Sequence, residues 1–100
     1  MEHEIRLKTG FFETTLYGLH ISKERLRLSP KTIGDQEIVL LGKDISDIHL
    51  KNGETLEIEI NTLAHSYQGT ITDKADYEEL LSGLKTNLTN KILCEYEGGN

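Results

Sequence analysis

The sequence predicts a mainly β domain of the α+β class, with six or seven strands followed by one C-terminal helix. Apolar and polar residues alternate with a period of two through most of the first seventy residues, as half-buried antiparallel strands require. The period changes once, near residue 73, to the spacing of an amphipathic helix. One hundred residues with 36% hydrophobic content suit one modest core. We therefore expect a single domain over 1–100, with its core at about 12–90 and a tail at 91–100.

The N-terminal third predicts three strands. Residues 4–8 alternate apolar and charged side chains, which indicates a short first strand or an arm. Residues 15–22 form the next strand, with the odd-numbered side chains on one face. Lys23-Glu24 makes a turn into residues 25–28, whose leucines are expected to point inward and whose arginines outward.

The middle of the chain predicts four more strands. Residues 37–41 are apolar on both faces, which is typical of a central strand. Residues 45–51 alternate, with Asp47, His49 and Lys51 expected to point outward. Asn52-Gly53 favours a two-residue type I′ hairpin turn. Residues 56–60 and 67–71 follow with the same alternation.

One helix is predicted between residues 73 and 90. Its apolar stripe consists of Tyr77, Leu80, Leu81, Leu84 and Leu88. Asp73 suits the N-cap, and the acids that follow suit the positive end of the helix dipole. Gly83 is expected to allow close packing of the helix against the sheet. Residues 92–96 alternate again and predict a short tail strand.

The order of these elements indicates how the sheet closes. A meander of short strands leaves exposed edges unless it curls into a barrel, and one late helix can plug the open end. The segment Gly18–Leu28, with its Gly, alternating apolar residues, Ile-Ser pair and Arg-Leu pair, resembles the opening hairpin of GRAM and bacterial PH-like domains. Residues 37–48 resemble the third-strand stretch of the same families, and residues 70–81 resemble their last strand entering the helix.

This resemblance covers roughly residues 12–90 and implies a PH-like antiparallel barrel capped by one C-terminal helix. PH domains commonly carry a Trp in the final helix, and this chain has none. A GRAM-type or bacterial PH-like relative therefore fits better than a member of the core PH family. The competing fold is another small helix-capped barrel or an α+β meander.

The charge distribution and the single cysteine limit the kinds of partner and the cellular compartment that the sequence predicts. Acids and bases balance over residues 1–52, so residues 53–100 carry the net charge of −6. An acidic domain repels phosphates at long range, which predicts no nucleic-acid partner and favours a basic protein. The lone Cys94 cannot form an internal disulfide and suits a reducing, cytoplasmic compartment. The sequence shows neither a secretory signal nor a transmembrane segment.

Catalytic and metal-binding motifs are missing from the sequence. It contains no nucleophile elbow, P-loop or dinucleotide fingerprint. Glu57 and Glu59 read as a solvated pair on one strand face. The histidines lack the spacing of metal ligands and are expected to be ordinary surface residues; they are His3, His20, His49 and His65. We expect no enzyme activity, no cofactor and no metal.

The leading functional prediction is a non-enzymatic interaction module that binds a protein partner or another copy of itself. A peptide could add to an open strand edge or lie in a groove between helix and sheet. The residues expected around that groove are Tyr67, Gly69, Ile71, Asp76, Glu79 and Gly83.

The alternative is peripheral binding of phospholipid or phosphoinositide headgroups. The resemblance to PH domains implies that basic residues around the first hairpin loop grip phosphates, which suits Lys and Arg side chains. The basic cluster in this sequence is Lys23, Arg25, Arg27 and Lys31. A third possibility, an enzyme or small-ligand carrier, needs an internal cavity.

The aromatic residues are few. Tyr17, Tyr67 and Tyr77 are expected in the core or at its rim. Phe11-Phe12 is expected to be buried at a chain crossing; an exposed pair would instead mark a contact surface.

Overall fold

The computed structural model describes residues 2–72, 77–88 and 91–96. Eight strands, one short 3₁₀ helix and one α-helix follow along the chain. Their bounds are β1 Glu2–Lys8, β2 Thr14–Ser22, β3 Arg25–Pro30, β4 Ile38–Leu41, η1 Gly42–Asp44, β5 Ile45–Asn52, β6 Leu56–Thr62, β7 Ser66–Ile71, α1 Tyr77–Asn87 and β8 Lys91–Tyr96.

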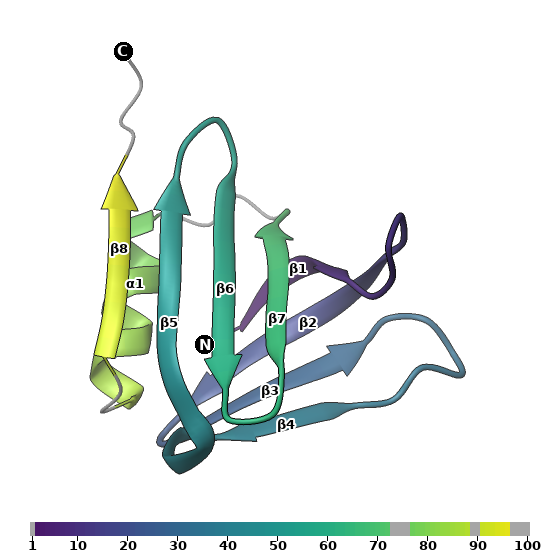
Figure 1. Ribbon diagram of the computed structural model, residues 1–100, viewed down its shortest axis with the longest axis horizontal. Helices are drawn as coiled ribbons and strands as arrows, with labels where there is room; N and C mark the ends of the chain where they lie inside the picture. The colour runs from purple at the N-terminus through teal and green to yellow at the C-terminus, as the bar shows by residue number, and fades with distance from the viewer. Residues whose placement is uncertain (1, 73–76, 89–90, 97–100) are drawn as a thin grey trace.

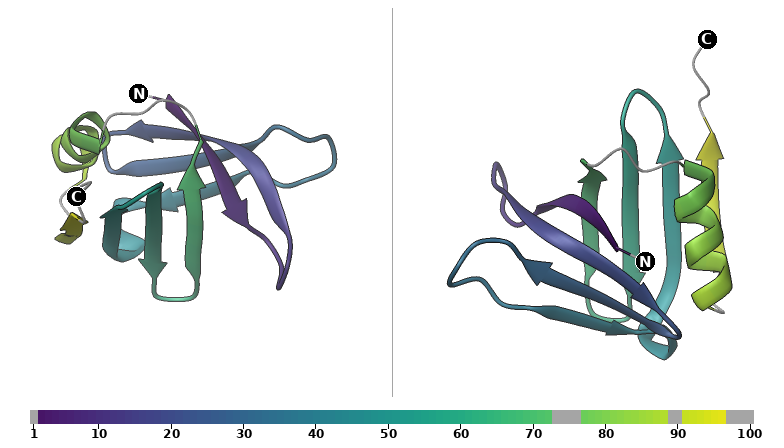
Figure 2. Two further views of the ribbon diagram at one scale, coloured as in Figure 1. Left: turned by 90° about the horizontal axis from the view of Figure 1, so that it is seen from above. Right: turned by 180° about the vertical axis from the view of Figure 1, so that it is seen from behind.

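The strands form one sheet in the order β4-β3-β2-β1-β7-β6-β5-β8. This sheet folds into two crossing layers, β1–β4 and β5–β8 (Figure 1 and Figure 2). β1 joins the layers, because it pairs with β2 along its whole length and with β7 through Ile5, Arg6 and Leu7. The mainly β prediction and the PH-like arrangement of seven antiparallel strands with a C-terminal helix are confirmed.

The core lies between the two layers, and α1 closes it at one corner (Figure 2). Leu80 and Leu84 of α1 are fully buried. The N–H of Glu24, in the β2–β3 turn, donates to the carbonyl of Asn87 at 2.7 Å. The last turn of the helix is therefore tied directly to the first layer. The predicted cap at Asp73 lies outside the described residues.

The core begins earlier than residue 12. Ile5 and Leu7 are both buried, so the N-terminal segment is a central strand and not an arm. The hairpin Gly18–Leu28 is consequently the second hairpin of the domain and not the first. Alternation alone could not distinguish an arm from a central strand, because both carry apolar side chains on one face.

The position of β4 in the sheet differs from the sequence-based expectation. It pairs with β3 alone and ends the sheet order, so the apolar segment 37–41 is an edge strand and not a central one. Only Leu40 is buried, while Val39 and Leu41 are 48% and 38% exposed.

The turn after β5 also differs from the sequence-based expectation. Asn52 pairs with Leu56, which leaves a three-residue loop in place of the predicted two-residue turn. The observed register puts Leu50 opposite Ile58. A two-residue loop at Asn52-Gly53 would have placed inward-facing side chains of β5 opposite outward-facing ones of β6. Matching of the buried faces therefore outweighs the local turn preference.

The predicted tail strand is present. β8 pairs parallel with β5, from Asp47↔Lys91 to Asn52↔Tyr96, and Ile92 packs against the core. The parallel direction follows from α1, which carries the chain back along the layer before β8 begins (Figure 1).

The Tyr17 side chain gives the fold a pH dependence. It is buried, and its hydroxyl donates to the carbonyl of Gln36 at 3.4 Å. Burial raises the pKa of the Tyr17 phenol above its ordinary value of 10.0, and the negative charge of Asp35 adds to the rise.

We expect the free energy of unfolding to fall as pH rises above about 10 and through the folded-state pKa of Tyr17. The unfolded chain releases the phenol proton first in that window, so the folded state binds more protons and loses relative stability. Urea unfolding of the wild type and of Tyr17→Phe across this range measures the difference. Parallel curves for the two proteins would contradict the assignment.

Candidate partner-binding surface

The β7 residues predicted to line a groove face the core. Ile71 is buried, and Tyr67 is half-buried and packs against the core. A Cβ atom on Gly69 would lie 2.7 Å from Cγ1 and Cδ1 of Ile5, so this position also faces inward. β7 pairs with β6 along its length and with β1 through Gly69, Thr70 and Ile71, so this half of the strand has no open edge. A partner can reach this half only from its outer face, where Thr70 lies.

The helix residues predicted to line the same groove do not form a common surface with the β7 residues. Gly83 is buried on the packed face of α1, as expected for close packing. Glu79 is exposed, and Asp76 lies outside the described residues. The described members of the predicted set therefore include both core and surface positions and do not line one groove.

The basic cluster is also divided. Lys23, Arg25 and Arg27 are exposed at and beyond the β2–β3 turn. Lys31 follows the other end of β3, and a six-residue strand separates it from Lys23. At about 3.3 Å per residue, this separation exceeds roughly 20 Å. One headgroup cannot contact both ends.

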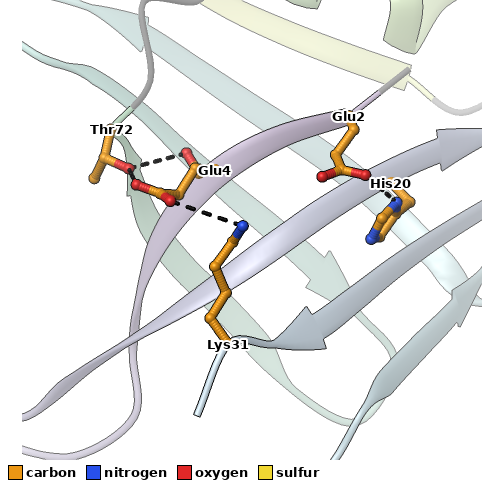
Figure 3. A network of polar contacts seen from close by, with 5 residues as sticks. All are labelled: Glu2, Glu4, His20, Lys31 and Thr72. Atoms are coloured by element: carbon orange, nitrogen blue, oxygen red, sulfur yellow. Dashed lines mark hydrogen bonds and ion pairs between the residues drawn. The ribbon is translucent and has the colours of Figure 1, made fainter.

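Lys31 belongs to a different network (Figure 3). Its Nζ lies 3.8 Å from Oε2 of Glu4, whose Oε1 accepts a hydrogen bond of 2.7 Å from Oγ1 of Thr72. Beside them, Nδ1 of His20 lies 3.1 Å from Oε2 of Glu2. These contacts tie the start of β1 to β2 and to the end of β7. The pairs are partly exposed, so each contributes little to stability.

The histidines lie apart from one another. His20 is on β2 and His49 is on β5, where its Nε2 lies 3.3 Å from Oδ1 of Asp47. His65 is exposed, but His3 is buried, which corrects the expectation of four surface histidines. Among residues 2–72, 77–88 and 91–96, no three His, Cys, Asp or Glu side chains are grouped as metal ligands. No helix in these ranges is long and apolar enough to span a membrane.

A concavity lies on the outer face of the sheet, beside the β1–β2 loop. It is an open hollow of about 590 Å³, and we call it the outer hollow. Its lining consists of Arg6, Lys8, Phe11, Phe12, Glu13, Thr14, His49, Leu50, Lys51, Glu57, Ile58, Glu59, Gln68, Gly69 and Thr70.

The floor of the outer hollow is charged in a definite order. Strand pairing aligns Arg6, Thr70, Glu57 and Lys51 in one row across β1, β7, β6 and β5. The acids of the floor, Glu57 and Glu59, thus lie on β6, between the bases on β5 and those on β1. Glu57 and Glu59 have no ion-pair partner among the described residues, so they can accept a basic group from outside.

The wall of the outer hollow carries Phe11 and Phe12, which are 85% and 92% exposed. Their rings stack edge to face, with centroids 4.6 Å apart. The N–H groups of Thr9 and Gly10 both donate to the carbonyl of Glu13, at 3.0 and 3.3 Å, and close the loop. The predicted burial of this pair is therefore wrong.

Sequence reasoning missed the outer hollow because its lining comes from five strands and a loop. The signal available was Phe11-Phe12 itself, placed between Gly10 and a run of polar residues with no alternating partner. Exposed aromatic pairs of this kind mark contact surfaces.

Comparison with known proteins establishes the fold of this chain but no family membership. The sequence matches no protein-family model and no curated protein. Among solved structures, the Spt16D Pob3N heterodimer is similar, with a TM-score of 0.69 and 17% sequence identity. The match covers 100% of this chain and 57% of the other, so this chain spans little more than half its length. At this identity the likeness establishes the fold alone, which is PH-like.

We expect Gly69→Ala to destabilise the domain by about 1–3 kcal/mol, the usual cost of overpacking. The new methyl group would press on Ile5 in the core and lie 3.0 Å from the carbonyl oxygen of Arg6. Replacing a strand Gly by Ala otherwise favours folding, so a measured loss reports the contact. Urea unfolding checks it against Gln68→Ala on the outer face, where a change within about 0.5 kcal/mol is expected. An unchanged G69A midpoint would show that Ile5 yields without cost.

Proposed function

We propose that this chain is a non-enzymatic interaction module that binds a segment of a partner protein in the outer hollow. The observation that carries the proposal is the position of Phe11 and Phe12 on its wall, both almost fully exposed. Large aromatic side chains that become buried on binding are the commonest energetic anchors of protein interfaces. The concave face beside them supplies the shape that a bound segment needs.

The charges of the floor indicate the chemistry of the partner. Glu57 and Glu59 present carboxylates at the centre of the outer hollow, and the chain as a whole carries a net charge of −6. A partner segment would therefore combine an apolar side chain, packed on the phenylalanines, with a Lys or Arg directed at β6. Cations also bind favourably over aromatic faces.

The structural comparison supports an interaction role. The similar solved structure is that of a heterodimer, so the PH-like fold there takes part in a protein complex. The partner segment belongs either to another protein or to a second copy of this chain, and size measurement of the purified domain distinguishes the two. Within the PH-like fold, the GRAM-type or bacterial PH-like assignment and the cytoplasmic location remain predictions from the sequence.

Headgroup binding by the basic cluster is the competing function, and the geometry supports it less. Lys31 faces Glu4 and is separated from the other three bases by the length of β3. Phosphate recognition by convergent bases needs them within one ligand's reach. Vesicle binding is therefore an outcome of the test below.

We expect the double variant F11A/F12A to lose at least about tenfold in affinity for peptides selected on the wild-type domain from a random library. The selected peptides should pair a basic with an apolar side chain and should bind E57Q/E59Q more weakly. Because both rings are exposed, the free energy of unfolding should change by less than about 0.5 kcal/mol. Fluorescence anisotropy with the selected peptides measures the affinities.

The matched controls remove exposed apolar side chains from other loops. I33A and L63A change residues that are 103% and 88% exposed, and their affinities should equal that of the wild type. Equal binding of the peptides by F11A/F12A and the wild type would refute the site. If the domain floats with anionic vesicles and no peptide is enriched from the library, the lipid function is favoured.

A further inference from the structure

The edge of the sheet at β4 has unusual chemistry. Natural edge strands are commonly protected by charged residues, Pro or a bulge. β4 reads Ile38-Val39-Leu40-Leu41, has no charge or Pro, and pairs with β3 in unbroken register. Val39 and Leu41 expose their side chains on the outer face. Only the four-residue length of the strand limits what can pair with it.

Polar backbone groups of Val39 and Leu41 point toward the open edge of the sheet and not toward β3. The N–H of Gly42 donates to the carbonyl of Glu24 at 2.8 Å, and the N–H of Lys31 donates to that of Leu16 at 3.0 Å. Bonding direction alternates along antiparallel strands. The even-numbered residues of β4 therefore bond to β3. Val39 directs its N–H and C=O outward at the open edge, and Leu41 directs its N–H outward. The carbonyl of Leu41 accepts the first bond of η1, because Leu41 is the N-cap of that helix.

Two arginines flank this edge. Arg25 lies opposite Leu41, and Arg27 lies opposite Val39. Both pairs are of the type without mutual backbone hydrogen bonds, in which side chains approach most closely, with Cβ atoms about 4.5–5.5 Å apart. Neither guanidinium has an ion-pair partner among the described residues. The nearby acids lie beyond the two ends of β4: Glu37 precedes it, Asp44 follows it, and the Glu24 carboxylate lies against Gly42.

We propose that the open edge of β4 is a second docking site, which takes an extended acidic segment of a partner protein as an added strand. The outward backbone groups of Val39 and Leu41 supply the main-chain hydrogen bonds of strand addition. Alternate Glu side chains of the segment would cover Val39 and Leu41 with their methylene groups and reach Arg25 and Arg27 with their carboxylates. The other side chains of the segment would extend the inner face beyond Leu40.

A second copy of this chain fits the edge less well. Pairing two β4 edges about a twofold axis would bring Arg25 and Arg27 of both copies to one face, where like charges repel. The site is also independent of the outer hollow, which contains no residue of β3 or β4. Failure of one site leaves the other testable.

The test is an NMR titration of the ¹⁵N-labelled domain with two end-blocked synthetic peptides, one alternating Glu and Val and the other alternating Lys and Val. At the β4 edge we expect the Glu peptide to bind at least tenfold more tightly than the Lys peptide, with affinities read from the shifts at the amides of Val39 and Leu41. The variant R25E/R27E should reverse the preference at these amides. Equal affinities at these amides, Glu-peptide shifts confined to residues outside β3 and β4, or no binding of the Glu peptide at millimolar concentration would overturn the proposal.

The matched pair V39A and V39P separates backbone from side-chain binding. Both variants remove the valine side chain, but only V39P also removes the backbone N–H. That N–H points to the open edge and makes no bond to β3. We expect V39A to retain most binding and V39P to lose it, with circular dichroism reporting the fold of each. Should V39P unfold, R25E/R27E decides, because both arginines are exposed. F11A/F12A should bind the Glu peptide normally, and a wild-type dimer that excludes the peptide would refute the assigned occupant.

Discussion

The contact between Ile5 and Gly69 is the constraint on which the arrangement of the two layers depends. β1 serves both layers, and its Ile5 side chain fills the space that a side chain on β7 would otherwise occupy. Gly69 lets the second layer come close enough for Ile5 to enter the core from the middle of the folded sheet. The helix then has only one open corner to close, and the outer faces of β1, β7, β6 and β5 form one continuous concave surface.

The sequence predicts the inside of this domain well because burial has a period. Inward positions of β2, β3 and β5 follow from alternation alone, and Leu80 and Leu84 follow from the helical stripe. The same principle explains the error at Asn52-Gly53. A two-residue turn would gain local backbone preference but would misalign the buried faces of β5 and β6, and burial of several side chains outweighs one turn.

The spatial order of the strands could not be derived in this way. β4 is as apolar as a central strand, yet it lies at an edge, because nothing in a strand's own residues reports how many neighbours it has. Phe11 and Phe12 show the converse error, since their hydrophobicity suggested burial. Both mistakes concern apolar residues that remain exposed in the isolated chain. Such residues indicate intermolecular contacts more directly than any polar motif in this sequence.

The two proposed sites have opposite charge preferences, and their separation in the fold explains how one chain can carry both. The carboxylates of Glu57 and Glu59 lie on β6, whereas Arg25 and Arg27 lie on β3, and three strands lie between these two in the sheet order. Complementary surfaces at different places on one molecule can join copies head to tail into open chains. The net charge of −6 opposes such assembly by general repulsion. A basic segment bound in the outer hollow is attracted by this net charge, whereas an acidic segment at β4 meets the same repulsion and must gain enough from Arg25 and Arg27 to offset it.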